Sequence, residues 1–418
     1  MKHAAVLLAL GLSALAGCVD HKGGLVNRDG VTTTQSIAVE LVGIAASAAG
    51  PSRTDPGDPA HRLPGDQRLL TFNLSAVDAA GNVDTSFDRK VAVYVQFLGT
   101  LTPSLNTVAT ANPITLATIQ MTAGKAMAQT VMLPEVFGPT TLWVDDGIDV
   151  DPTYATGASP TLWYRDPFIS DIQTPPDEKA LNALTDSPLE TKQITVNSSR
   201  YGDAGRLVVT SVFSQGYTVS DVKCGDASGA PPCVASAYDH VEVFSFSAPV
   251  DQNGKLLQEG QLIDSFVGGI SEFNGLTEIG FPGTVANSAP ADPAREPGAV
   301  KLDPATWFGP LSTAEGIINF ERNEAGPIEI DMGTVCMLDG DYTTFKQWKL
   351  DPTGVGGDCS GNRNVLNVIT AGVINDLDPA TLVGKTLPRV VGILRPVEIG
   401  TFDVWIIFPR SAADLTLE

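Results

Sequence analysis

Short segments of alternating apolar and polar residues recur along most of this chain. Between residues 36 and 164 the alternation has the period of two that is typical of half-buried β-strands, and turn residues such as Asp78 and Gly81 separate the segments. The segments are residues 37–44, 69–78, 90–99, 114–121, 128–136 and 140–146. Short strands at this spacing predict a β-sandwich over residues 34–166.

A second series of alternating segments follows a proline-rich stretch. Residues 167–190 hold four prolines among polar residues, which predicts a linker with at most one helical turn at 178–184. The later segments are residues 207–213, 216–222, 240–247, 261–273, 276–282, 326–336, 365–372, 390–397 and 405–409. They predict two further β units, residues 191–300 and 301–418, and therefore an all-β protein.

The chain begins with a basic Lys2, an apolar run over residues 4–16 and the sequence Leu15-Ala16-Gly17-Cys18. The run is shorter than the roughly 18 residues needed to span a bilayer. This pattern resembles the lipobox of bacterial lipoprotein precursors, and the alternative is a chance match inside a core helix. The resemblance implies that residues 1–17 are a signal peptide, that Cys18 is lipidated with palmitate-type acyl chains, and that residues 18–33 are a tether.

The resemblance also implies an address. Val19 stands where Gram-negative lipoproteins retained at the inner membrane carry an aspartate, so we expect an outer-membrane lipoprotein facing the periplasm or the cell surface. The membrane is then its first partner, because the lipid anchor holds the protein there.

Four cysteines remain beyond Cys18, and they form two local pairs. Cys224 lies near Cys233, and Cys336 lies near Cys359. In an exported protein such pairs predict two disulfides. The alternative is metal or redox chemistry, which the absence of a close Cys-x-x-Cys pair disfavours.

Two family resemblances refine the predicted units. Residues 76–95 with 122–134 resemble bacterial Ig-like repeats, which implies an Ig-like sandwich. Residues 272–279, Glu-Phe-Asn-Gly-Leu-Thr-Glu-Ile, and the ending from Trp405 to Leu415 resemble OB-fold modules of secreted bacterial nucleases. Gln261 replaces the aspartate usual in those modules. The resemblance implies two tandem OB-like barrels, and no catalytic domain of those nucleases is visible beside them.

The net charge of the chain limits the classes of partner that it can bind. The chain has 26 basic and 48 acidic side chains, a formal net charge of −22. Residues 191–300 carry 6 basic and 12 acidic side chains, and residues 301–418 carry 9 and 16. Such surfaces repel phosphate backbones, so nucleic acid is an unlikely partner.

OB barrels bind ligands on aromatic side chains, which makes several residues candidates for a ligand face. The candidates are Phe213, Tyr217, Phe244, Phe246, Arg395 and Arg410. Arg363, Lys385 and Arg389 also make the second barrel locally less acidic. The alternative interpretation of these basic residues is structural pairing with neighbouring acids, and for Arg410 the expected partner is Asp414.

An acidic run offers one further candidate site. Asp145, Asp149 and Asp151 supply clustered carboxylates of the kind that Ca²⁺ prefers, although their spacing departs from an EF-hand. The alternative is a solvated acidic turn. The sequence predicts no other cofactor.

Catalytic patterns are missing from the sequence. It contains no His-Glu-x-x-His, Gly-x-Ser-x-Gly or P-loop motif, and His21, His61 and His240 have no predicted catalytic partner. We therefore expect a non-enzymatic binding or scaffold module with an unidentified protein or glycan ligand. The alternatives are a nucleic-acid or oligosaccharide-binding accessory of an extracellular hydrolase, and a hydrolase with an unrecognised carboxylate site.

Overall fold

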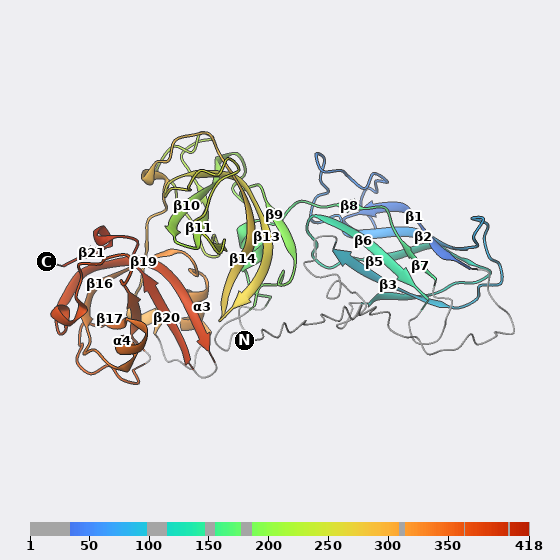
Figure 1. The fold of residues 1–418 in the computed structure, drawn as a ribbon. Coiled ribbons are helices and arrows are strands. Elements are labelled where there is room, and N and C mark those ends of the chain that lie inside the picture. Colours follow the sequence, from blue (N-terminus) through green and yellow to red (C-terminus); the bar gives the residue numbers. More distant parts are fainter. Residues whose placement is uncertain are drawn as a thin grey trace, which may run out of the picture.

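The computed structural model describes residues 34–97, 115–146, 155–176, 186–308, 314–362, 364–399 and 402–417. They form three β units in a row: an N-terminal sandwich, barrel 1 in the middle and barrel 2 at the C-terminal end (Figure 1). The all-β prediction is confirmed. Residues 1–33, which hold Cys18 and the predicted signal peptide and tether, lie outside the described residues.

The sandwich has two facing sheets. One has the order β1-β2-β5 and the other β4-β3-β6-β7, with β8 paired to β6. The strands are β1 (Ser36–Ala45), β2 (Leu69–Val77), β3 (Lys90–Phe97), β4 (Thr115–Gln120), β5 (Lys125–Met132), β6 (Pro139–Asp145), β7 (Thr156–Ala158) and β8 (Leu162–Trp163). All six strands expected in this unit are present. The finer Ig-like assignment stays a prediction.

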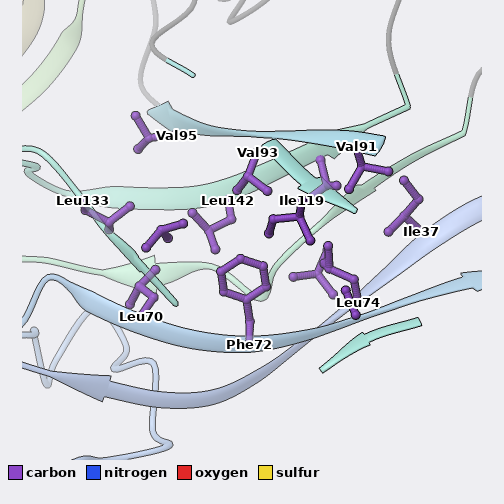
Figure 2. Close-up of a cluster of buried hydrophobic side chains, with 14 of the residues drawn as sticks. Ile37, Leu70, Phe72, Leu74, Val91, Val93, Val95, Ile119, Leu133 and Leu142 are labelled. Atoms are coloured by element: carbon purple, nitrogen blue, oxygen red, sulfur yellow. The ribbon is translucent and has the colours of Figure 1, made fainter. Parts of the chain in front are cut away.

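The alternation of apolar and polar residues in the sequence corresponds to alternating burial of the side chains in these sheets. Leu70, Phe72 and Leu74 of β2 are fully buried, while the residues between them are half-buried. Figure 2 shows Phe72 from one sheet and Leu142 from the other in the same apolar layer. Burying each large side chain contributes about 1.5–3 kcal/mol, so this layer holds the two sheets together.

The junction between sandwich and barrel 1 is packed. Helix α1 (Ile169–Gln173) follows the sandwich, and Ile169 and Ile172 are fully buried in the core of barrel 1. Asn197 of barrel 1 donates a hydrogen bond to Asp166 at 2.8 Å. The linker prediction therefore missed α1, because a five-residue helix leaves no apolar period in the sequence; the helical turn expected at 178–184 lies outside the described residues.

Barrel 1 is a closed five-stranded barrel. Its strands run in the order β10-β11-β12-β14-β13, β10 pairs with β13 to close it, and β12 and β14 are parallel. This is the Greek-key order of an OB-like barrel. The elements are β9 (Gln193–Val196), η1 (Gly202–Ala204), β10 (Gly205–Phe213), β11 (Gly216–Lys223), β12 (His240–Phe244), β13 (Leu262–Phe273), β14 (Leu276–Ala286) and η2 (Pro293–Arg295).

Barrel 2 repeats this order. Its strands run β16-β17-β18-β20-β19, β16 pairs with β19, and β18 and β20 are parallel. The strands are β15 (Val300–Lys301), β16 (Pro327–Val335), β17 (Gln347–Asp351), β18 (Leu366–Ile369), β19 (Thr386–Ile399), β20 (Phe402–Phe408) and β21 (Leu415–Thr416). The helices are α2 (Pro304–Trp307), α3 (Ala314–Glu321), α4 (Gly340–Phe345), η3 (Pro379–Leu382) and η4 (Ala412–Asp414).

Three short helical turns share one local sequence, Asp-Pro-Ala. Asp292, Asp303 and Asp378 each accept a hydrogen bond from the backbone N–H two residues later, and proline occupies the first helical position. An aspartate cap followed by proline favours a helix start because the side chain satisfies a free N–H and the proline φ is already helical.

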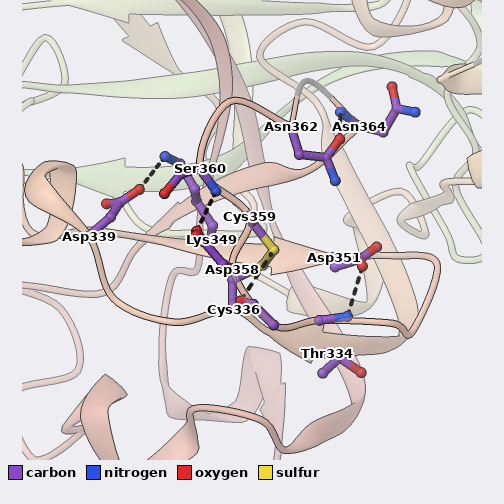
Figure 3. The surroundings of a disulfide bond; sticks show 12 residues. Thr334, Cys336, Asp339, Lys349, Asp351, Asp358, Cys359, Ser360, Asn362 and Asn364 are labelled. Carbon is purple, nitrogen blue, oxygen red and sulfur yellow. Dashed lines mark hydrogen bonds and ion pairs between the residues drawn. A yellow bond between two sulfur atoms is a disulfide. The ribbon is translucent and has the colours of Figure 1, made fainter.

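Both predicted disulfides are confirmed. Cys224 bonds to Cys233 in barrel 1, and Cys336 bonds to Cys359 in barrel 2. Figure 3 shows the second bond next to the Lys349–Asp339 ion pair. It fastens the loop after β17 to the end of β16, a part of barrel 2 with little regular structure.

Candidate ligand-binding site

Three phenylalanines gather where β12 ends and β14 bends. Phe244 lies at the end of β12, Phe246 follows it, and Phe281 lies within β14. The ring centroids of Phe244 and Phe246 are 4.5 Å apart in an edge contact, and those of Phe246 and Phe281 are 4.9 Å apart. We call these three residues the aromatic cluster.

The two outer rings of the cluster are exposed. Phe246 exposes 55% of its surface and Phe281 exposes 81%. A pair of adjacent aromatic rings in water is unusual on a folded domain, because such apolar surface is normally buried or functional. The pair is therefore the first candidate for a binding surface on barrel 1.

The backbone at Phe246 and Phe281 has an energetically unfavourable conformation. Phe246 has a φ of 58° and Phe281 a φ of 54°, in the left-handed region that bulky residues rarely adopt. Phe281 and Pro282 form a β-bulge, since both lie opposite the single Gly268 between the pairs Val267↔Gly283 and Gly269↔Gly280. Gly268 is required there, because a Cβ atom would lie 2.7 Å from the carbonyl oxygen of Gly280. Bulges and left-handed residues re-aim side chains and concentrate at functional sites.

A pocket of about 160 Å³ lies at the base of Phe281. Its lining residues are all uncharged, and they include Tyr217, Ser245, Ser247, Pro249, Pro282 and Thr284. The floor is rigid, because the buried Tyr217 hydroxyl and Thr284 Oγ1 are hydrogen-bonded at 2.8 Å. The volume is below the 300–1,000 Å³ typical of whole-ligand pockets, so it fits one ring or side chain of a longer ligand.

The structure separates the predicted ligand face into two groups. Phe244 and Phe246 belong to the aromatic cluster. Tyr217 lies beneath it as part of the core and not as a surface ring, and burial raises the pKa of its hydroxyl far above the ordinary value. Phe213 is half-buried at the end of β10, on the side that meets barrel 2.

Arg395 lies at the contact between the two barrels. Its guanidinium lies 5.1 Å from the Phe408 ring and 5.7 Å from the Phe213 ring, and it donates to Glu242 Oε1 at 2.7 Å. Glu242 belongs to barrel 1 and is fully buried. Arg395 and Phe213 therefore connect the two barrels, and their assignment to a ligand face stays a prediction.

Arg410 is structural in the same sense. It donates to both carboxylate oxygens of Asp414 at 3.1 Å, as expected, and also to the carbonyl oxygen of Thr210 in barrel 1 at 3.0 Å. It pairs with Glu296 as well. Arg389 pairs with Glu329 at 2.6 Å, while Lys385 is exposed. Arg363 lies outside the described residues.

The predicted calcium loop is described only in part. Asp145 is buried at the end of β6, whereas Asp149 and Asp151 lie outside the described residues. The neighbouring Asp146 pairs with Arg89 at 3.3 Å. Within the ranges that the structure covers, no group of three metal-ligating side chains is present.

The described histidines have structural surroundings. His240 is 3% exposed, its Nδ1 lies 2.6 Å from Ser220 Oγ, and burial lowers its pKa to about 4. Gly326 of barrel 2 packs directly against the imidazole of this Ser–His pair. His61 is exposed and lies 3.2 Å from Asp58, and His21 lies outside the described residues.

Another cleft lies at the opposite end of barrel 1. It measures about 620 Å³ and is lined by polar residues such as Asn197, Arg206 and Asp264. Its side chains are already engaged, since Asn197 donates to Asp166 and Asn287 donates to Asp264 at 2.6 Å. Phe246 and Phe281 instead keep 55% and 81% of their surfaces exposed, which makes the aromatic cluster the better candidate.

Phe281 was missed by the sequence reasoning, although a signal was present. The segment Gly280-Phe281-Pro282-Gly283 puts a proline inside a strand pattern, and within sheets proline is confined to edges, strand starts and bulges. The bulge was therefore predictable. That it places Phe281 against Phe246 was not, because Phe246 follows β12 while Phe281 lies in β14, and the two residues are far apart in the sequence.

Comparison with known proteins gives no relative from which a function could be transferred. No protein-family model, curated protein or solved structure matches the chain. Among the described helices, none is long and apolar enough to cross a membrane.

Proposed function

We propose that this protein is a lipid-anchored, non-enzymatic binding protein of the outer membrane, in which barrel 1 captures its ligand on the aromatic cluster. Cys18 supplies the anchor, and the Ig-like sandwich is a spacer between the tether and the barrels. The observation that carries the proposal is the pair of exposed rings, Phe246 and Phe281, held in left-handed backbone beside a neutral pocket.

The cost of this arrangement supports a binding role. Residues held in sparsely populated backbone regions cost on the order of 1–3 kcal/mol each, and two such residues here also expose apolar rings to water. A ligand that covers the rings gives the arrangement a benefit that stability alone does not.

The chemistry of the site favours a neutral oligosaccharide. A pyranose ring has an apolar face that stacks on a phenyl ring, and its hydroxyl groups can donate to the hydroxyl oxygens of Ser245 and Ser247, which themselves donate to each other's carbonyl oxygens at 2.5 and 3.4 Å. The pocket accepts one ring, and the exposed rings beside it extend the contact to the next. A polyanion is disfavoured, because barrel 1 carries twice as many acidic as basic side chains and both candidate arginines are engaged elsewhere.

The experiment is a binding titration of the full-length protein in detergent with three probes: a panel of neutral oligosaccharides, a proline-rich peptide and labelled single-stranded DNA. We expect saturable binding of at least one neutral oligosaccharide, with little dependence on salt. Phe281→Ala should weaken that binding about 10- to 100-fold, which corresponds to the 1.5–3 kcal/mol gained by burying one phenyl ring.

Phe273→Ala is the matched control. Phe273 is 59% exposed and also belongs to barrel 1, but it lies in the β13–β14 hairpin, outside the aromatic cluster. Its substitution should leave the affinity unchanged. If only the peptide binds, the ligand is a protein and not a glycan. If DNA binds in a salt-sensitive way, the nucleic-acid alternative is supported. If both variants lose the same affinity, the aromatic cluster is not the binding site.

A further inference from the structure

Glutamates from both barrels meet where barrel 2 packs against barrel 1. Glu321 is the last residue of α3 in barrel 2 and Glu324 follows the helix, and they expose only 5% and 3% of their surfaces. Glu272 lies near the end of β13 in barrel 1. Glu324 Oε1 accepts a hydrogen bond from the backbone N–H of Thr277 in β14 at 3.1 Å and one from Gln173 Nε2 at 3.3 Å. A carboxyl group of barrel 2 therefore fastens a strand of barrel 1 and helix α1. We call this contact region the seam.

The glutamate that barrel 1 contributes to this cluster is hydrogen-bonded through one carboxyl oxygen. Glu272 Oε1 accepts from the backbone N–H of Ser187 at 2.7 Å and from Thr277 Oγ1 at 2.8 Å. By contrast, Oε2 of Glu321 and Oε2 of Glu324 are buried without a hydrogen-bond partner among the described residues. A buried oxygen of that kind is far less costly on a neutral carboxylic acid than on a carboxylate.

The charged groups that act on this cluster are acidic. Asp186 acts on Glu272 and Glu321, and Glu190 acts on Glu272. Burial, reinforced by this mutual repulsion, raises the pKa of Glu272 to about 7 and of Glu321 to about 8, and raises the pKa of Glu324 well above its ordinary value. These groups therefore hold protons at pH values where exposed glutamates have lost them.

Other contacts also join the two barrels, among them the hydrogen bond from Arg410 to the carbonyl oxygen of Thr210 at 3.0 Å. His240 borders the seam with a neutral ring, which packs against Gly326 so closely that a Cβ atom there would lie 2.4 Å from the imidazole. The basic side chain next to the cluster in sequence is Arg322, whose carbonyl oxygen accepts from the Tyr238 N–H at 2.8 Å. The Glu242–Arg395 pair lies at the same boundary, with Glu278 adding negative charge.

We propose that the seam is a proton-held joint: the two barrels are locked together while Glu272, Glu321 and Glu324 each hold a proton, and they separate reversibly when those protons leave above neutral pH. Loss of the protons places like charges in a region that water barely reaches, where repulsion is much stronger than at a surface. Each barrel has its own apolar core, so relief by separation leaves both cores intact. Separation would also change how barrel 1 is presented from the membrane.

The test is amide hydrogen exchange of the full chain at pH 6 and pH 9, with each rate divided by the intrinsic rate at the same pH. The N–H groups of Thr277 and Tyr238 report the seam, because their acceptors belong to barrel 2. The N–H of Val209, which donates to Gln261 O at 2.9 Å inside barrel 1, reports the barrel core. We expect protection of the two seam amides to fall at least 10-fold at pH 9, while protection of Val209 is retained.

The double variant Glu321→Gln, Glu324→Gln keeps the size of both side chains and cannot ionise. It should hold the seam protected at both pH values, and the single variant Glu324→Gln should show a smaller fall than the native protein. Glu135→Gln, which removes an exposed glutamate of the sandwich, should behave as the native protein does. Constant protection of the native seam from pH 6 to pH 9, a parallel fall at Val209, or the same fall in the double variant would each overturn the proposal.

Discussion

Replacing Arg395 by methionine should destabilise the protein in a strongly pH-dependent way. Arg395 is the partner of Glu242, whose side chain is fully buried, and the two groups are 2.7 Å apart. Burial raises the pKa of Glu242 to about 7 although the guanidinium opposes the shift. At pH 9 the variant has either an unpaired buried carboxylate or a carboxyl group that must hold its proton against the solvent. Breaking a buried pair in this way costs about 3–5 kcal/mol.

At pH 5 the same substitution should cost much less. Glu242 is then protonated in the native protein, so its neutral acid needs no counter-charge. What remains is the loss of the guanidinium contacts with the rings of Phe213 and Phe408, each worth about 0.5–1 kcal/mol at such a site. The expected cost is therefore about 1–2 kcal/mol at pH 5.

The pH dependence of the stability of the native protein is a second test of the direction of this effect. Because the folded-state pKa of Glu242 is raised from 4.5 to about 7, the folded protein keeps a proton that the unfolded chain releases. The stability from this group is fully present below pH 4.5 and declines by about 3 kcal/mol as the pH rises through 7. Glu242→Gln should remove that decline.

The assay is urea unfolding at pH 5 and pH 9 of four proteins that all carry Glu321→Gln and Glu324→Gln, so that the barrels stay docked at pH 9: this background itself, and the background with Arg395→Met, with Glu242→Gln, or with both. If the pair acts as described, Arg395→Met costs at most about 1–2 kcal/mol at either pH when Glu242 is already glutamine, since no charge is then stranded. An Arg395→Met cost that is equal at the two pH values, or costs that simply add at pH 9, would refute this account of the pair.

Three further outcomes follow from the structure. Replacing Cys336 and Cys359 by serine should lower the free energy of unfolding by about 3 kcal/mol, measured by urea denaturation, because the bond closes a loop over 23 positions; an unchanged midpoint would contradict a bridge. Phe72→Ala should cost about 3–5 kcal/mol and lower the melting temperature of the sandwich transition in calorimetry, whereas the exposed Met127→Ala should leave it nearly unchanged. Cys18→Ser should move the protein from the membrane to the soluble fraction on centrifugation, and retention of the variant in membranes would contradict the lipid anchor.

The strands could be predicted well from the sequence, because the alternating burial along a β-strand appears as a local alternation of apolar and polar residues. Residues 69–78 were read as a strand, and β2 covers Leu69–Val77 with every second residue buried. The barrel order came instead from the resemblance of short motifs, since alternation alone does not say that β12 and β14 run parallel. The disulfides were predictable because each pair is local and the chain is expected to be exported.

The site and the seam were largely beyond the sequence, for a physical reason. Arg395 was chosen as a ligand residue because its charge and its strand were visible, but its partner Glu242 lies 153 positions away. Gln173 and Glu324 are 151 positions apart. Contacts of this kind depend on how the two barrels dock. The sequence around one partner holds no local signal that identifies the other partner. Arg410 was predictable because Asp414 lies only four positions later.

The account rests on Phe246 and Phe281 acting as one binding platform, and its most direct test is a comparison of dissociation constants. The constants are measured for the native protein, Phe246→Ala, Phe281→Ala and the double variant with the oligosaccharide that binds best. Because the two rings are 4.9 Å apart and share the ligand, each single variant should lose about 10- to 100-fold and the double variant little more. Single variants that bind as tightly as the native protein would contradict the site.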